Sequence, residues 1–118
     1  MLDKNAILAA ADLKSQDIDV PEWGGTVRVK TLSGIERERF LATVAATEPG
    51  TDPNQRMGIL IRHLLVTTLV GEDGLRLFSD DDVDTLGTKS AEVLQRLFIV
   101  AQTLNGLGAK AQDNITKN

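Results

Sequence analysis

Four aspartates between residues 80 and 84 are the side chains best suited to metal chemistry, because hard cations need several oxygen ligands at set spacings. They are Asp80, Asp81, Asp82 and Asp84. With Asp80 as the first ligand of a calcium-binding loop, Thr85 stands where the loop needs glycine and Ala91 where it needs a bidentate glutamate. The spacing therefore argues against calcium. A run of acids is instead typical of a helix start, where the helix dipole attracts negative charge.

His63 is the single histidine and the second candidate for chemistry. A histidine that acts as a general base needs an orienting carboxylate and a nucleophile within reach. The chain contains no cysteine and no tyrosine, and none of its serines stands in a nucleophile-elbow context. We therefore interpret His63 as a polar residue at the edge of a helix, and we expect no enzymatic activity, no cofactor and no metal.

The composition limits the classes of partner that the protein can bind. Thirteen Lys and Arg against seventeen Asp and Glu give a net charge of −4, which repels nucleic-acid phosphates, and the sequence has no compensating basic patch. Aromatic residues make up only 3% of the chain, so platforms for stacking bases are scarce. No 18-residue apolar run and no secretory signal pattern occur. These features predict a cytoplasmic protein that binds neither nucleic acid nor membrane.

A short helix and a β-hairpin are predicted at the N-terminus. Leu2 and Ile7 flank Asp3 as a hydrophobic staple around a helix N-cap, which predicts a helix through about Ala11. Apolar and polar residues then alternate on both sides of residues 21–25, as they do in a half-buried hairpin whose glycines allow the tight reversal. The alternating apolar residues are Ile18, Val20, Val27 and Val29.

Two longer helices follow the hairpin in the predicted order. Ser33 and Glu36 form a capping box, which predicts a helix start, and this helix ends within residues 47–52. Its core-facing stripe is expected to contain Phe40, Leu41, Val44 and Ala45. Residues from about 53 to 70 are apolar on nearly every face, which predicts a central helix that is either covered by other elements or open to a partner.

The C-terminal part is predicted to contain a turn at residues 71–74, a short extended stretch at 75–78 and two more helices. The first helix ends at Gly87, and the second begins near Thr88 or Ser90 and ends before Gly106. Residues 108–118 lack a core-forming pattern and are expected to be a flexible tail, which leaves residues 1–107 as the domain. The fold class is therefore mainly α (α+β): a small helical domain of four to five helices with an N-terminal β-hairpin.

The order of these segments resembles that of the tail assembly chaperones of long-tailed, lambda-like phages. The likeness covers about residues 5–107 and is strongest at Val20-Pro21-Glu22-Trp23-Gly24. Its other parts are Ile7–Asp12, Val27–Val29, Leu32–Gly34 with Glu36 and Arg37, Asp73-Gly74, Leu77-Phe78, Asp81–Val83, Leu86-Gly87, Lys89-Ser90, and Leu97-Phe98 with Ala101, Leu104 and Asn105. None of these segments is a catalytic signature, so the specificity of the likeness comes from their order.

The resemblance implies a function in phage tail morphogenesis. In that family a short chaperone, encoded just ahead of the tape measure protein, coats that protein and keeps its apolar helices soluble. A ribosomal frameshift yields a longer form whose extra domain recruits the major tail protein. The resemblance implies that this chain is a short form that acts in the host cytoplasm, self-associates into a homo-oligomer and is absent from the mature virion. The alternative function is that of a head–tail connector or tail completion protein, which would stay in the particle.

Six apolar residues are candidates for contact with a partner within that function. They are Trp23, Ile7, Leu8, Leu60, Leu64 and Phe98. Each is equally suited to the core, and the core interpretation is preferred for each. For Trp23, at the hairpin tip, the choice lies between an anchor that fixes the hairpin on the helices and an exposed binding residue, and packing is favoured because a lone large aromatic is usually recruited to the core.

Overall fold

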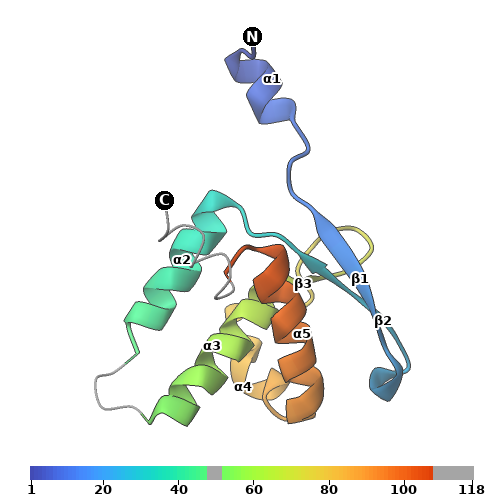
Figure 1. Cartoon of the computed structure of the whole chain (residues 1–118), viewed down its shortest axis with the longest axis vertical. Helices are drawn as coiled ribbons and strands as arrows, with labels where there is room; N and C mark the ends of the chain where they lie inside the picture. The colour runs from blue at the N-terminus through green and yellow to red at the C-terminus, as the bar shows by residue number, and fades with distance from the viewer. Residues whose placement is uncertain (48–51, 108–118) are drawn as a thin grey trace.

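The computed structural model describes residues 1–47 and 52–107, and it has the predicted α+β architecture. A small antiparallel sheet lies against a group of helices, and a short N-terminal helix stands apart from both (Figure 1). The elements are α1 (Lys4–Ala9), β1 (Ser15–Val20), η1 (Pro21–Trp23), β2 (Gly25–Lys30), α2 (Gly34–Ala45), α3 (Pro53–Thr68), β3 (Leu69–Val70), η2 (Asp80–Asp82), α4 (Val83–Leu86) and α5 (Ala91–Leu104).

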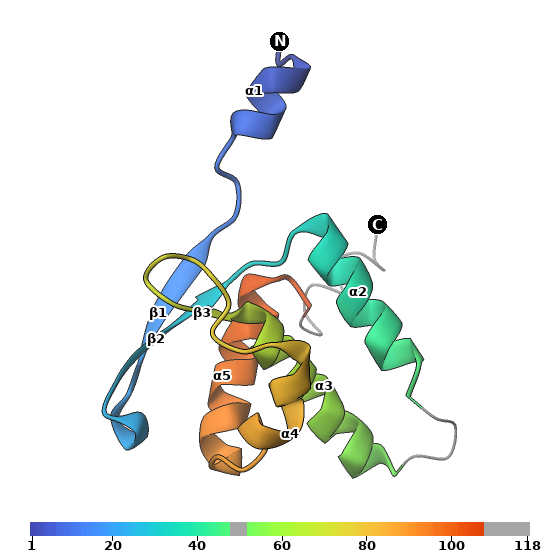
Figure 2. The same cartoon turned by 180° about the vertical axis from the view of Figure 1, so that it is seen from behind.

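The first helix has the predicted cap but ends two residues earlier than Ala11. The Asp3 carboxylate accepts a hydrogen bond from the backbone N–H of Ala6 at 2.8 Å, which satisfies one of the free donors of the first turn. None of the residues of α1 is buried, and the helix lies away from the rest of the protein in both opposite views (Figures 1 and 2). The expectation that Ile7 and Leu8 belong to the core is therefore wrong.

The predicted hairpin is formed by β1 and β2, with Val20 opposite Gly25 at the turn. Gly24 has φ of 75°, a left-handed conformation that costs glycine no steric strain. A third strand, β3, pairs with β2 and places Val29 opposite Leu69. We predicted helix through Val70; instead α3 ends at Thr68, because Leu69 and Val70 pair with the exposed edge of the hairpin. From periodicity alone, a buried apolar run of this kind fits a helix as well as a strand.

The core lies where α3 passes between α2 and α5 and beneath the sheet (Figure 1). Leu64 and Leu65 of α3 are buried, as are Leu97 of α5 and Val29 of the sheet. The N-terminal half of α3 is exposed or half-buried, so its apolar residues are not all covered. The stripe of α2 is narrower than expected: Phe40 is buried, but the prediction that Leu41 faces the core is wrong.

The segment between β3 and α5 packs over the sheet and the helices (Figure 2). The predicted turn is present, with the Gly71 N–H donating to the carbonyl of Leu75, and Arg76 forms a β-bridge with Val70. The acids follow as the start of a helical segment. Ser79 is its N-cap, and the Asp82 carboxylate accepts a hydrogen bond from the Ser79 N–H at 2.8 Å.

The last helix, α5, begins after Ser90 and ends in a C-terminal cap that contains Gly106. The N–H of Leu107 donates to the carbonyl of Gln102 and the N–H of Gly106 to that of Thr103, which together make a Schellman motif. Gly106 has φ of 67°, as this motif requires. The predicted loop residues 48–51 and the predicted tail 108–118 lie outside the described residues, so the domain boundary at 107 stays a prediction.

Candidate functional site

An apolar groove lies between α2, α3 and α5 and has a volume of about 310 Å³. Its lining residues are Phe40, Leu41, Leu60, Leu64, Phe98, Gln102 and Leu107. None of these side chains is ionisable, and Gln102 is the single polar residue among them. We call this feature the groove. A concave apolar surface with little polar lining is suited to the apolar face of a helix.

The floor and the rim of the groove differ in burial. Phe40, Leu64 and Phe98 are core residues whose surfaces form the floor, and Leu60 is half-buried beside them. Leu60 and Leu64 stand one helical turn apart on α3, so both face the same side. Leu41 forms the rim and remains 50% exposed. The floor is therefore fixed by core packing, while the rim offers apolar surface to a partner.

The cap of α5 sets one end of the groove. Because Gly106 reverses the chain after Asn105, Leu107 turns back toward the groove instead of continuing along the helix axis. Gln102 donates a hydrogen bond from Nε2 to the carbonyl of Leu107 at 3.4 Å, which holds this reversed segment beside the helix. The same glycine that ends the helix thus shapes the binding surface.

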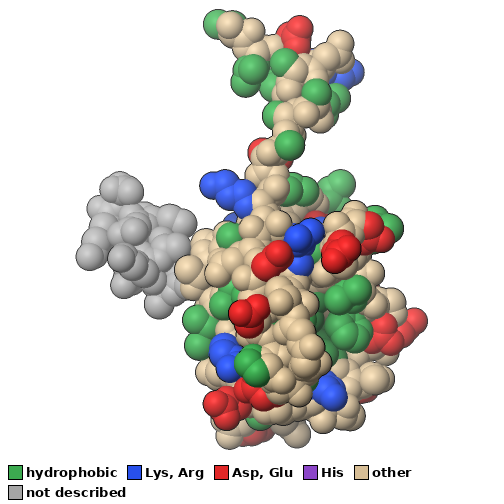
Figure 3. Space-filling model, turned by 90° about the vertical axis from the view of Figure 1, so that its right-hand side faces the viewer, with side chains coloured by type: hydrophobic (Ala, Val, Ile, Leu, Met, Phe, Trp, Pro, Cys, Tyr) green, Lys and Arg blue, Asp and Glu red, His purple; other side chains and the backbone are tan. Residues whose placement is uncertain are grey.

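A second apolar surface is the N-terminal arm, which we define as residues 1–13. Ile7 is 57% exposed and Leu8 is 73% exposed, and no other part of the described chain covers the helix that carries them. The space-filling view shows hydrophobic side chains open to solvent on the arm (Figure 3). The arm is joined to the hairpin at Lys14, whose N–H donates to Thr31 Oγ1 at 2.9 Å and whose carbonyl accepts from the Thr31 N–H at 2.8 Å.

Trp23 lies at the tip of the hairpin and lines a pocket that is separate from the groove. It is half-buried and packs against the core cluster beside Phe78 and Leu86. The adjacent Glu22 accepts a hydrogen bond from Arg96 at 2.7 Å, which ties the tip to α5. The position of Trp23 agrees with its role as an anchor of the hairpin on the helices.

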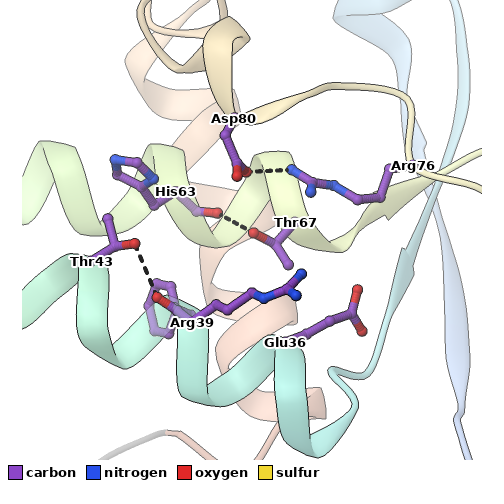
Figure 4. A pocket seen from close by; sticks show the side chains of 8 residues that line it. Glu36, Arg39, Thr43, His63, Thr67, Arg76 and Asp80 are labelled. Atoms are coloured by element: carbon purple, nitrogen blue, oxygen red, sulfur yellow. Dashed lines mark hydrogen bonds and ion pairs between the residues drawn. The ribbon is translucent and has the colours of Figure 1, made fainter.

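A small polar pocket of about 80 Å³ lies on the other side of α2, and it contains His63 (Figure 4). Its hydroxyl groups are used within the helices: Thr43 Oγ1 donates to the Arg39 carbonyl and Thr67 Oγ1 to the His63 carbonyl. Arg76 donates to Asp80 at 2.9 Å across the pocket. The two hydroxyl bonds stay within α2 and within α3, and the Arg76–Asp80 pair joins the preceding loop to η2. None of these interactions aligns a base with a nucleophile.

Two ionisable side chains of this pocket, His63 and Glu36, have shifted pKa values. Burial lowers the pKa of His63; the nearby carboxylates of Asp80 and Asp84 oppose this shift, and Arg62 adds to it. Burial would raise the pKa of Glu36, but hydrogen bonds from Lys30 and from the Ser33 backbone outweigh burial and lower it. Glu36 also completes the predicted capping box by accepting from the Ser33 N–H at 3.0 Å. Both shifts follow from structural packing.

Among residues 1–47 and 52–107, no three His, Cys, Asp or Glu side chains come together as a metal site. The carboxylates of Asp80 and Asp82 are directed to Arg76 and to the Ser79 backbone. Within the same part of the chain, no helix is long and apolar enough to cross a bilayer.

A family model described as phage tail assembly chaperone matches residues 2–117 of the chain. The chain belongs to the phage tail assembly chaperone family. This finding confirms the resemblance drawn from the order of the sequence segments. Membership of the family implies interaction with tail proteins, and together with the fold it indicates a non-catalytic role. No curated protein sequence matches the chain.

The fold of this family member is similar to that of a solved structure, the tail assembly chaperone of bacteriophage HK97. The two chains are 23% identical, with a TM-score of 0.66, and the match covers 85% of this chain and 94% of the other. At this identity the likeness concerns the fold alone.

The structure places the six candidate binding residues of this chaperone at three locations. Leu60, Leu64 and Phe98 meet in the groove, Ile7 and Leu8 lie on the arm, and Trp23 lies at the hairpin tip. Sequence reasoning missed four groove residues, which are Phe40, Leu41, Gln102 and Leu107. The signal that could have identified Leu107 is the C′ glycine before it, because a Schellman motif usually brings the following apolar residue back onto the helix.

Proposed function

We propose that this chain binds the tape measure protein through the groove and keeps it soluble during tail assembly. The single observation that carries the proposal is a groove with an uncharged lining, an apolar rim and a rigid floor, on a chain of the tail assembly chaperone family. The apolar stripe of a long tape measure helix must be covered before the tail tube forms around it. A helix-in-groove contact covers such a stripe through side chains spaced three and four residues apart.

Reversible binding is the second requirement of this function, and the dimensions of the groove suit it. A groove of about 310 Å³ accepts a few apolar side chains of a helix, so each contact is limited in area. Many copies along one tape measure protein would then cover it, while each copy remains replaceable by tube protein. We further propose that the chaperone acts in the host cytoplasm, self-associates into a homo-oligomer when free of its client, is absent from the finished virion, and has a frameshifted longer form that recruits the major tail protein.

The test is co-expression of the neighbouring tape measure protein with the wild-type chain and with two matched variants. Leu41→Glu places a charge at the rim of the groove, and Ile99→Glu places one on α5 outside it. The two parent side chains are similarly exposed, at 50% and 52%, so neither substitution buries a charge in the core. The measurement is the fraction of tape measure protein that remains in the supernatant.

Wild-type chain and Ile99→Glu are expected to keep the tape measure protein soluble, whereas Leu41→Glu loses most of this effect. If the two variants solubilise the tape measure protein equally well, the groove is not its binding site. If the tape measure protein stays insoluble with all three chains, the proposed function is refuted. Mass spectrometry of purified particles tests whether the chain is absent from the virion, because a chain retained there would contradict a transient chaperone.

A further inference from the structure

The arm contains a helix that gains no packing from the rest of the described chain, residues 14–47 and 52–107. A six-residue helix in water is unstable by itself, because the cost of nucleation exceeds what so few hydrogen bonds return. Its cap at Asp3 and its alanines favour the helix, but no residue of α1 is buried. Ile7 and Leu8 are consecutive residues, about 100° apart around the helix axis, and both belong to one broad apolar stripe. A capped amphipathic helix without a covered face requires a surface to pack on.

The chemistry of the arm matches that of the groove. Residues 5–11 of the arm, Asn-Ala-Ile-Leu-Ala-Ala-Ala, carry no charge, and no ionisable side chain lines the groove. By contrast, the pocket at the base of the arm contains Asp12, Lys14 and Arg37, and the pocket beside β2 contains Asp17, Arg28 and Glu72. The uncharged segment of the arm therefore matches the uncharged lining of the groove.

We propose that the arm of one copy docks in the groove of a second copy of this chain, with Ile7 and Leu8 packed against the Leu41 rim and the floor formed by Leu64 and Phe98. Each copy then donates one arm and receives another, so the contact is head-to-tail and can be repeated. The helix of the arm becomes stable because its apolar stripe is covered by the acceptor.

The geometry favours a second copy over the arm's own groove. Lys14 is held to Thr31, which leaves four linker residues, Ala10–Leu13, between this anchor and α1. Four residues span at most about 14 Å. The linker leads away from the three helices that form the groove in both opposite views, so docking on another molecule needs no reversal of the linker (Figures 1 and 2).

The C-terminal residues of the same chain suit the groove less well. Residues 108–118 contain one large apolar residue, Ile115, among polar and small residues. The arm offers Leu2, Ile7, Leu8 and Leu13 within a segment of similar length. Of the two termini, the arm therefore supplies more apolar surface to bury.

The size of the arm makes the contact weak and reversible. A stable interface takes about 20–30 residues from each partner, and the arm supplies thirteen at most. Assembly should therefore depend on concentration. This inference rests on the proposed function in one respect: arm and tape measure helix use the same groove, so the arm covers the groove until the client displaces it.

The experiment is sedimentation velocity of the purified full chain over a range of concentrations, without any client. The arm variant carries Ile7→Asp and Leu8→Asp, and the groove variant carries Leu41→Glu. The matched control for the arm is Leu75→Asp, because Leu75 is 68% exposed and Leu8 73%, and Leu75 lies outside both arm and groove. Since no residue of α1 is buried, the arm variant leaves the body folded, which circular dichroism checks.

We expect the wild-type chain and Leu75→Asp to associate as concentration rises, and each of the two variants to remain monomeric. Loss of two buried apolar side chains should weaken association about a hundredfold or more. A mixture of the arm variant and the groove variant should form a heterodimer, in which the intact arm of the groove variant occupies the intact groove of the arm variant. This heterodimer does not grow further, because its remaining arm and its remaining groove are the substituted ones. A wild-type monomer, or variants that associate like wild type, would overturn the inference.

A client assay separates failure of this inference from failure of the proposed function. The arm variant retains its groove, so it should solubilise the tape measure protein at least as well as wild type while it is itself monomeric. If no chain solubilises the tape measure protein but the mixture still forms heterodimers, the proposed function fails and the arm contact stands. If solubilisation occurs but the arm substitution does not change association, the arm contact fails alone.

Discussion

The side-chain oxygen of Asn105 accepts a hydrogen bond from the backbone N–H of Leu32 at 2.6 Å. The amide nitrogen of the same side chain donates to the carbonyls of Ala101 and Lys30 at 2.9 and 3.3 Å. One side chain thereby joins the end of α5 to the connection between β2 and α2. Because α2 and α5 form two walls of the groove, this link fixes the position of one wall relative to the other.

Asn105→Ala should lower the free energy of unfolding by about 2 kcal/mol, because it leaves partly buried backbone groups of Leu32 and Lys30 without partners, at about 1–3 kcal/mol for each unsatisfied group. Urea denaturation at pH 7 measures the effect. Gln95→Ala, at an exposed position of the same helix, is the control and should change stability little. Equal stability of the two variants would show that the link does not contribute.

Gly106→Ala should destabilise the protein by about 1 kcal/mol, because Gly106 adopts a left-handed φ of 67° that costs an L-residue about 1–2 kcal/mol. The control is Gly34→Ala at the first residue of α2, where φ is not positive. A Cβ at either position would meet no heavy atom within 4 Å, so the comparison isolates backbone conformation. Thermal unfolding of both variants measures the difference, and a Gly106→Ala protein as stable as Gly34→Ala would contradict it.

Protonation of His63 should destabilise the fold, because burial lowers the pKa of this imidazole in the native state. The unfolded chain then binds more protons than the folded chain just below the unfolded pKa of about 6.5, so stability falls as the pH falls through that value and levels off below the folded pKa. Urea denaturation between pH 7.5 and pH 5.5 follows the change, with His63→Gln as the reference. Parallel pH profiles of the two proteins would rule out a contribution from His63.

Local features were predictable because they depend on residues a few positions apart. The hairpin around Gly24 and the capping box of Ser33 and Glu36 are present as predicted. The same holds for the acid-rich helix start after Ser79 and the glycine that ends α5. In each case a backbone donor or a left-handed residue restricts which amino acid fits, so the pattern is specific. The family could be inferred in the same way, from the order of these segments.

Short-range patterns were not sufficient where a distant strand or helix competes. Leu69 and Val70 continue the apolar run of α3, yet they leave the helix and pair with β2. Pairing with β2 involves residues some forty positions away, and no helical or strand period identifies it. The same limit explains why Phe40 and Leu41 could not be distinguished: both fit the stripe of α2, and the packing of α3 and α5 buries only one of them.

The sequence by itself determined the elements other than β3, their caps, the acidic charge and the family of this protein, since these properties belong to single residues or close neighbours. Only the tertiary structure decided which apolar side chains are exposed at the surface. Leu60, Leu64 and Phe98 meet in one groove because three helices pack together, whereas Ile7 and Leu8 remain exposed because none of the helices and strands that the structure describes reaches them. Burial is a property of what packs against a side chain, and that depends on segments distant in sequence.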